Sequence, residues 1–150
     1  MENLFPEGYE DLIIEPDDTL FASPTGYKQS VNYSDGDLSR DGQNKVDTAN
    51  GLKAWEQWCQ NCLATERYSK PVYSTDFGIE TEEAMRCNDT KKAESILTRE
   101  IRESLEADPY QRTKSVQSII FDWKADSLEV SVQVLGIDDA TIDITTTIRR

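Results

Sequence analysis

The 150-residue sequence contains no histidine. Without an imidazole, the chain cannot build a Ser-His or Cys-His catalytic arrangement from its own residues. Its three cysteines are an odd number, which does not suit a disulfide framework. Cys59 and Cys62 have the spacing of a redox or zinc motif, but they fall inside a predicted helix and zinc needs four ligands. We therefore interpret the cysteines as buried structural thiols and expect no metal or cofactor.

Long apolar runs and an excess of basic residues are also missing. No apolar stretch approaches the roughly 20 residues that span a bilayer, and no basic segment followed by an apolar one indicates a secretory signal. The formal net charge is −13, from 16 Lys and Arg against 29 Asp and Glu. Like charge repels nucleic-acid backbones and anionic membranes. The sequence therefore predicts protein partners, with no nucleic acid and no membrane, and a chain kept in the cytoplasm.

Catalytic motifs are scarce as well. The sequence has neither of the glycine-rich patterns that cradle phosphates. Asp76-Phe77-Gly78 has the letters of the kinase metal-binding triplet but none of its partner motifs. With 29 acids, some carboxylate pair always lies at a separation that glycoside hydrolysis could use, so such a pair decides nothing. Glu66 stands out among the acids, and a structural pair with Arg67 explains it better than catalysis.

The first 27 residues contain seven acids, three prolines and two glycines, but no Lys or Arg. Leu12-Ile13-Ile14 is a short apolar run among them. This composition predicts an acidic arm over residues 1–30 that is extended or disordered on its own. Two interpretations remain open: a frayed terminus, or a segment that orders on a neighbouring subunit with the apolar trio as its anchor.

Residues 31–150 are predicted to form one domain that begins with a short strand or hairpin, rich in turn residues, over 31–46. A helix follows, capped by a polar member of 47–50, with one apolar face that comprises Leu52, Trp55, Cys59 and Leu63. Ile79–Arg86 is a short helix candidate. A longer helix over Lys91–Ala107 has the apolar ladder Ala93, Ile96, Leu97, Ile101 and Leu105, and Asp108-Pro109 ends it.

The last forty residues change to a period of two, which is typical of half-buried strands. Three strands are expected, at Val116–Trp123, Leu128–Val134 and Thr141–Ile148, joined by turns at 125–127 and 136–139. The sequence therefore predicts an α+β fold with helices packed on one face of a small C-terminal antiparallel meander.

The segment Gly51–Glu80 joins an amphipathic helix to Thr65-Glu66-Arg67-Tyr68 and then to Phe77-Gly78. With the second long helix and the closing strands, this order resembles the baseplate wedge, or sheath-initiator, family of contractile phage tails, also labelled lysozyme-like. The similarity covers about Tyr33 to Ile148. Related branches occur in prophages, phage-tail-like bacteriocins and type VI secretion baseplates. The resemblance implies a structural protein that is no enzyme, present in multiple copies in a sixfold baseplate, first in the host cytoplasm and then in the particle.

The resemblance also implies contact residues. In the family a Glu-Pro-Arg motif follows the second long helix and contacts neighbouring wedge subunits; the matching place here has Asp108, Pro109 and, two residues later than the motif, Arg112. The resemblance thus implies contacts to wedge and hub or tube-initiator proteins at Asp108, Arg112 and the loop residues Glu66, Arg67 and Tyr68.

The small sheet of the family resembles the linking domain of the tail sheath protein, which borrows strands from its neighbours. The resemblance implies that Thr141–Ile148, with Ile142, Ile144 and Ile148, offers an edge to the first sheath ring. In the other interpretation this strand pairs internally, and the terminal arginines 149–150 keep the edge soluble. Two further functions remain as alternatives: a tail connector or assembly adaptor outside the wedge, and a peptidoglycan hydrolase.

Overall fold

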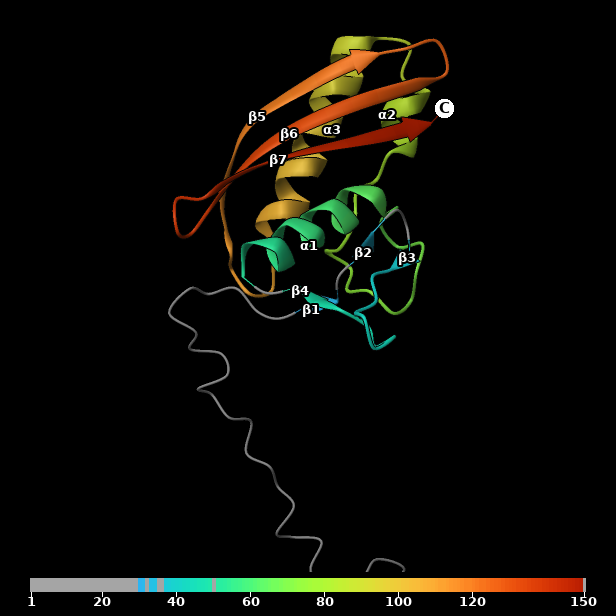
Figure 1. Ribbon diagram of the computed structural model, residues 1–150. Coiled ribbons are helices and arrows are strands. Elements are labelled where there is room, and N and C mark those ends of the chain that lie inside the picture. Colours follow the sequence, from blue (N-terminus) through green and yellow to red (C-terminus); the bar gives the residue numbers. More distant parts are fainter. Residues whose placement is uncertain (1–29, 32, 35–36, 50, 150) are drawn as a thin grey trace, which may run out of the picture.

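The computed structural model describes residues 30–31, 33–34, 37–49 and 51–149 (Figure 1). The predicted acidic arm, with Leu12, Ile13 and Ile14, lies outside the described residues except for its last position. The helices are α1 (Leu52–Ala64), α2 (Glu82–Arg86) and α3 (Thr90–Glu106). The strands are β1 (Ser30–Val31), β2 (Tyr33–Ser34), β3 (Asp37–Leu38), β4 (Thr48–Ala49), β5 (Thr113–Trp123), β6 (Ser127–Gly136) and β7 (Thr141–Arg149).

The main sheet is an antiparallel meander in the order β5-β6-β7. Alternate residues of β6 and β7 are buried, because successive side chains of a strand point to opposite faces. Helix α3 packs against β5 and α1 packs against β7, so the helices lie together on one side of the sheet (Figure 1). The α+β prediction is confirmed, and so are the three strands in their predicted order.

The helices join the sheet through one continuous core. On α1 the predicted face is confirmed at Trp55, Cys59 and Leu63, which are buried. It is wrong at Leu52, which is 42% exposed in the first turn, where Ala54 is buried instead. The first turn of a helix lacks part of its main-chain hydrogen bonding and is less constrained than the rest. A residue there, such as Leu52, can therefore match the apolar spacing and still lie outside the core.

Two boundary predictions are wrong. Helix α1 has Gly51 as its N-cap, with no side-chain cap hydrogen bond, and the preceding Thr48 and Ala49 form β4 instead of a cap. The short helix begins at Glu82, not Ile79, because Ile79 pairs in parallel with Glu66. The antiparallel pair of β2 with β3 lies within residues 31–46, where a short strand or hairpin is predicted, whereas the pair of β1 with β4 joins the two ends of that segment and extends beyond it.

Candidate functional site

The free edge of β7 follows from the order of hydrogen bonds in the meander. The N–H of Gly136 donates to the carbonyl of Ala140 at 2.8 Å, which closes the β6–β7 hairpin. Antiparallel ladders alternate between bonded and non-bonded pairs, so the even-numbered residues of β7 bond to β6. The odd-numbered residues from Thr141 to Arg149 therefore direct their main-chain N–H and C=O groups away from β6. Among the described residues, no strand pairs with this side of β7.

The side chains of β7 divide between two faces. The three predicted contact residues Ile142, Ile144 and Ile148 are buried, at 6%, 2% and 8% exposure, and they hold the strand on the helices. Thr145 and Thr147 are exposed on the other face. What β7 presents to a neighbour along its edge is consequently main chain, and the isoleucines support that edge from within the fold.

The other edge of the sheet, on β5, has a different character. Its pairing with β6 shifts register twice, between Thr113 and Ser115 and between Val116 and Ser118. Such irregularities bend a strand and disturb the spacing of its outward main-chain groups. The pairing of β7 with β6 runs without a shift from Thr141 to Arg149. Of the two edges, β7 is therefore the one suited to extension by another strand.

A loop from Thr65 to Ile79 closes on itself beside the end of α1. The N–H of Arg67 donates to the carbonyl of Ile79, and the N–H of Ile79 donates to the carbonyl of Thr65, both at 3.0 Å. Gly78 fits this closure because its φ is +96° and a Cβ there would lie 2.7 Å from the Thr65 carbonyl oxygen. The predicted aromatic-glycine pair, Phe77-Gly78, thus lies where main-chain hydrogen bonds close the loop.

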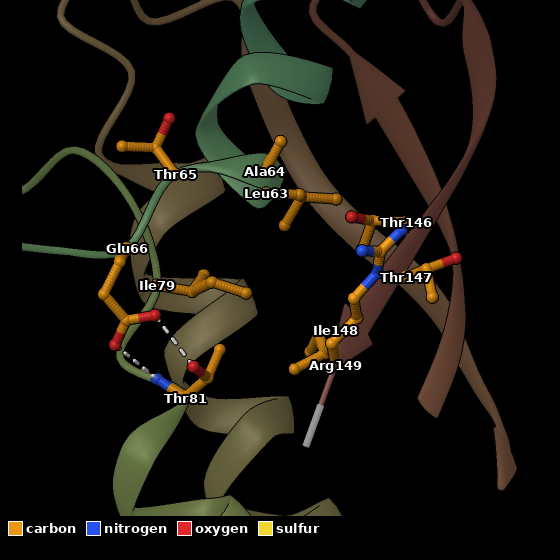
Figure 2. Close-up of a pocket in the computed structure, with 10 residues that line it drawn as sticks. All are labelled: Leu63, Ala64, Thr65, Glu66, Ile79, Thr81, Thr146, Thr147, Ile148 and Arg149. Atoms are coloured by element: carbon orange, nitrogen blue, oxygen red, sulfur yellow. Dashed lines mark hydrogen bonds between the residues drawn. The ribbon is translucent and has the colours of Figure 1, made fainter. Parts of the chain in front are cut away.

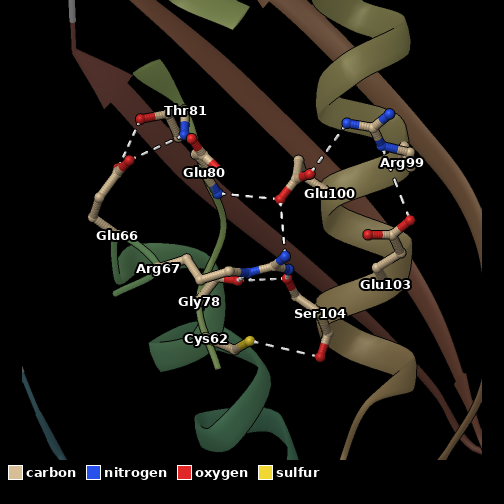
Figure 3. Close-up of polar contacts among 10 residues, drawn as sticks. All are labelled: Cys62, Glu66, Arg67, Gly78, Glu80, Thr81, Arg99, Glu100, Glu103 and Ser104. Atoms are coloured by element: carbon tan, nitrogen blue, oxygen red, sulfur yellow. Dashed lines mark hydrogen bonds and ion pairs between the residues drawn. The ribbon is translucent and has the colours of Figure 1, made fainter. Parts of the chain in front are cut away.

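Arg67 and Glu66 do not pair with each other, so the predicted Glu66–Arg67 pair is wrong. Arg67 turns inward, donating to the Gly78 carbonyl and to the Ser104 hydroxyl, with Nη1 3.3 Å from Glu100 (Figure 3). Glu66 turns the other way and accepts hydrogen bonds from the N–H and hydroxyl of Thr81. Adjacent residues with extended geometry point to opposite sides, which the sequence motif does not reveal.

Tyr68 is the outward-facing member of the predicted contact loop. It is 68% exposed and has a φ of +64°, a left-handed conformation that bulky residues seldom adopt. Val72 and Tyr73 are also exposed, and the ring of Tyr73 packs on Phe77 at 4.5 Å. The closed loop therefore exposes apolar side chains, while main-chain hydrogen bonds hold its two ends together.

Asp108 and Arg112 contact each other near the end of α3, and both side chains are buried. Arg112 donates through Nε and Nη2 to the two carboxylate oxygens of Asp108 at 2.8 and 2.9 Å, and the two side chains are 3% and 0% exposed. The guanidinium also lies 5.4 Å from the ring of Trp58 and 5.0 Å from that of Tyr110. This pair shapes the turn between α3 and β5, and Tyr110 is its exposed neighbour.

A hollow of about 270 Å³ lies where α1, the closed loop and the end of β7 meet (Figure 2). Leu63 and Ile79 form its floor and are nearly fully buried. Polar residues complete its lining: Thr65, Glu66, Thr81, Thr146, Thr147 and Arg149. Sequence reasoning missed this hollow, because its lining joins residues 63–81 to residues 146–149, more than sixty positions later in the chain.

The remaining chemistry is that of a packed core. Burial raises the pKa of the Cys62 thiol to about 11, so the thiol stays protonated at neutral pH and is a weak nucleophile. Within the described part of the chain, no three Cys, Asp or Glu side chains gather as metal ligands would. None of its described helices has the length and apolar character needed to cross a membrane.

Comparison with known families assigns most of the described chain, up to the turn that precedes β7. Residues 28–139, well over half of the chain, match the family described as contractile injection system sheath initiator. A search among curated proteins gave no match. The family has a structural part in starting the sheath of a contractile tail, which agrees with a fold that offers a sheet edge. The chain belongs to the contractile injection system sheath initiators.

Proposed function

We propose that this protein is a baseplate wedge component that nucleates the tail sheath by pairing β7 with a strand of the first sheath ring. The observation that carries the proposal is the uninterrupted edge of β7, which no other strand of the described part of the chain pairs with. An incoming strand gains main-chain hydrogen bonds along such an edge, and alternate side chains then select the partner. The donated strand comes from the sheath protein, and no enzyme activity is involved.

Other surfaces serve the neighbours in the wedge and the hub, in a sixfold assembly. Tyr68 presents an exposed ring from the closed loop, whose conformation Arg67 and Glu66 maintain from its base. Asp108 and Arg112 act indirectly, because their buried pair holds the turn that exposes Tyr110. The acidic arm supplies a further contact through Leu12, Ile13 and Ile14. The protein assembles in the host cytoplasm and ends in the baseplate of the particle.

Thr145→Pro tests the edge directly. The N–H of Thr145 points away from β6, so proline removes an outward donor while the pairing within the sheet is retained. Thr145→Val is the matched control, since it keeps the N–H and the branched shape. Particles are examined by electron microscopy in a strain whose own gene is deleted, complemented with each variant.

The proposal expects tubes or baseplates without sheath for Thr145→Pro and normal sheathed tails for Thr145→Val. Circular dichroism of the purified variants checks that both are folded. Sheathed tails at normal yield with a folded Thr145→Pro protein would contradict pairing at β7 and favour the role of a connector or adaptor outside the wedge.

A further inference from the structure

The edge of β7 carries little information about register. Apart from Arg149, its exposed side chains are Thr141, Asp143, Thr145 and Thr147, so three of these four positions are threonine. A partner strand that slips by two residues keeps the same face outward and meets nearly the same side chains. Main-chain pairing alone would therefore leave the position of the incoming strand poorly fixed along β7. A second contact at one end of the strand is needed to specify the register.

The hollow lies at the C-terminal end of this edge and holds a charged group without a partner. Arg149 has no hydrogen-bond or ion-pair partner among the described residues. Its side chain folds back so that the guanidinium lies beside Thr146 and near Leu63 (Figure 2). Across the hollow, Glu66 already accepts two hydrogen bonds from Thr81, at 3.1 and 2.8 Å. The Arg149 guanidinium is therefore a hydrogen-bond donor in the hollow that still lacks an acceptor within the described part of the chain.

We infer that the hollow fixes the register of the sheath strand by binding one of its acceptor side chains, an Asp or Glu, through Arg149. This inference rests on the proposed pairing at β7. A guanidinium recognises a carboxylate through two parallel hydrogen bonds, which gives geometric specificity. Thr146 lines the same space, and its hydroxyl points toward Leu63 and can donate to the same group (Figure 2). The hollow is smaller than a typical site for a drug-sized ligand and suits one side chain.

The test measures binding of the purified sheath protein of the same injection system to this chain. Arg149→Ala is expected to weaken binding about tenfold, because it removes a charge-assisted contact that the docked strand partly covers. The difference from the unsubstituted protein should shrink at high salt. Arg102→Ala is the matched control, since Arg102 is an exposed arginine on α3 that does not line the hollow. Its affinity should stay within about twofold of the unsubstituted protein.

Register is read separately with a photo-cross-linking phenylalanine analogue in place of Ala64, an exposed residue at the rim of the hollow. One sheath residue should be cross-linked in the otherwise unsubstituted protein, and Arg149→Ala should spread the cross-links to residues two positions away. Unchanged affinity and a single cross-linked residue in Arg149→Ala would overturn the inference. The same assay tests the proposed pairing at β7 with a different variant. Loss of sheath-protein binding in Thr145→Pro would support the pairing, and normal binding in Thr145→Pro would contradict it.

Discussion

Two acid–arginine pairs in this molecule have the same spacing along the chain and opposite surroundings. Asp108 and Arg112 are four residues apart and their side chains are almost fully buried in the turn between α3 and β5. Glu82 and Arg86 are also four residues apart, on α2, where 63% and 76% of their side chains are exposed. Both pairs are in contact. The spacing alone therefore does not predict how much each pair contributes to the stability of the fold.

The difference lies in what happens when one partner is lost. A buried charge without its partner keeps the full cost of leaving water, whereas an exposed charge is simply hydrated. Arg67 and Glu100 form a third, intermediate case, with side chains 12% and 8% exposed that come from the closed loop and from α3. Burial, rather than the presence of a pair, should rank the effects of substitution.

Arg112→Met should have the largest effect. It keeps most of the side-chain volume but leaves Asp108 charged, buried and without its bidentate partner. We expect the free energy of unfolding to fall by about 3–5 kcal/mol. Urea denaturation followed by circular dichroism measures this loss.

The double variant Asp108→Asn with Arg112→Met separates the cost of an orphaned charge from the value of the pair. Both charges are removed, and the Asn amide oxygen can still accept from one of the two main-chain N–H groups that Asp108 binds, so this variant should lose less stability than Arg112→Met alone. A double variant as unstable as Arg112→Met would show that the orphaned charge does not set the cost.

Arg67→Met should have an intermediate effect. It leaves Glu100 only 8% exposed and removes hydrogen bonds to the Gly78 carbonyl and the Ser104 hydroxyl. We expect a loss of about 2–3 kcal/mol. Amide hydrogen exchange should also quicken at Ile79, whose N–H closes the loop. Exchange at Ile79 as slow as in the unsubstituted protein would mean that the loop stays closed without Arg67.

Glu82→Gln should change stability by no more than about 0.5 kcal/mol, because the pair with Arg86 is solvated on both sides. The same urea denaturation applies, with the Arg112 variants as the reference for a large effect. A loss above 1 kcal/mol would break the ranking by burial.

Lys114→Gln should have the smallest effect on stability and a visible effect on one titration. The Lys114 ammonium, 2.8 Å from Asp139, lowers the pKa of that carboxyl in the folded protein. The stabilisation from this shift is present above the unfolded-state pKa and is lost as pH falls through the folded pKa. Lys114→Gln should return the pKa of Asp139 toward its ordinary value, as measured by NMR titration of the Asp139 carboxyl carbon. An unmoved pKa would show that Lys114 is not its cause.

Much of the sheet is predictable from sequence, because alternation in β6 and β7 follows directly from which face meets the core. The buried face of α1 is predictable for the same reason, except at Leu52 in the first turn. The direction of Glu66 and Arg67 is not, since their partners Thr81 and Glu100 are chosen by tertiary packing.

The buried state of Asp108 and Arg112 is equally hidden from the sequence. A charged pair near a helix end is most often exposed, and only the rings of Trp58 and Tyr110 around the guanidinium show why this one is covered. The family match supplies the association with the sheath but not the position of the hollow beside β7.

The meander has a consequence for the order of events during synthesis and folding. Its three long strands are consecutive and joined by tight turns, with residues 124–126 between β5 and β6 and residues 137–140 between β6 and β7. Contacts between neighbours in sequence form quickly, because little loop entropy is lost in closing them. The β7 edge is therefore complete within microseconds to seconds of the chain's release. If β7 pairs with the sheath as proposed, the folding of this edge does not limit the rate of assembly.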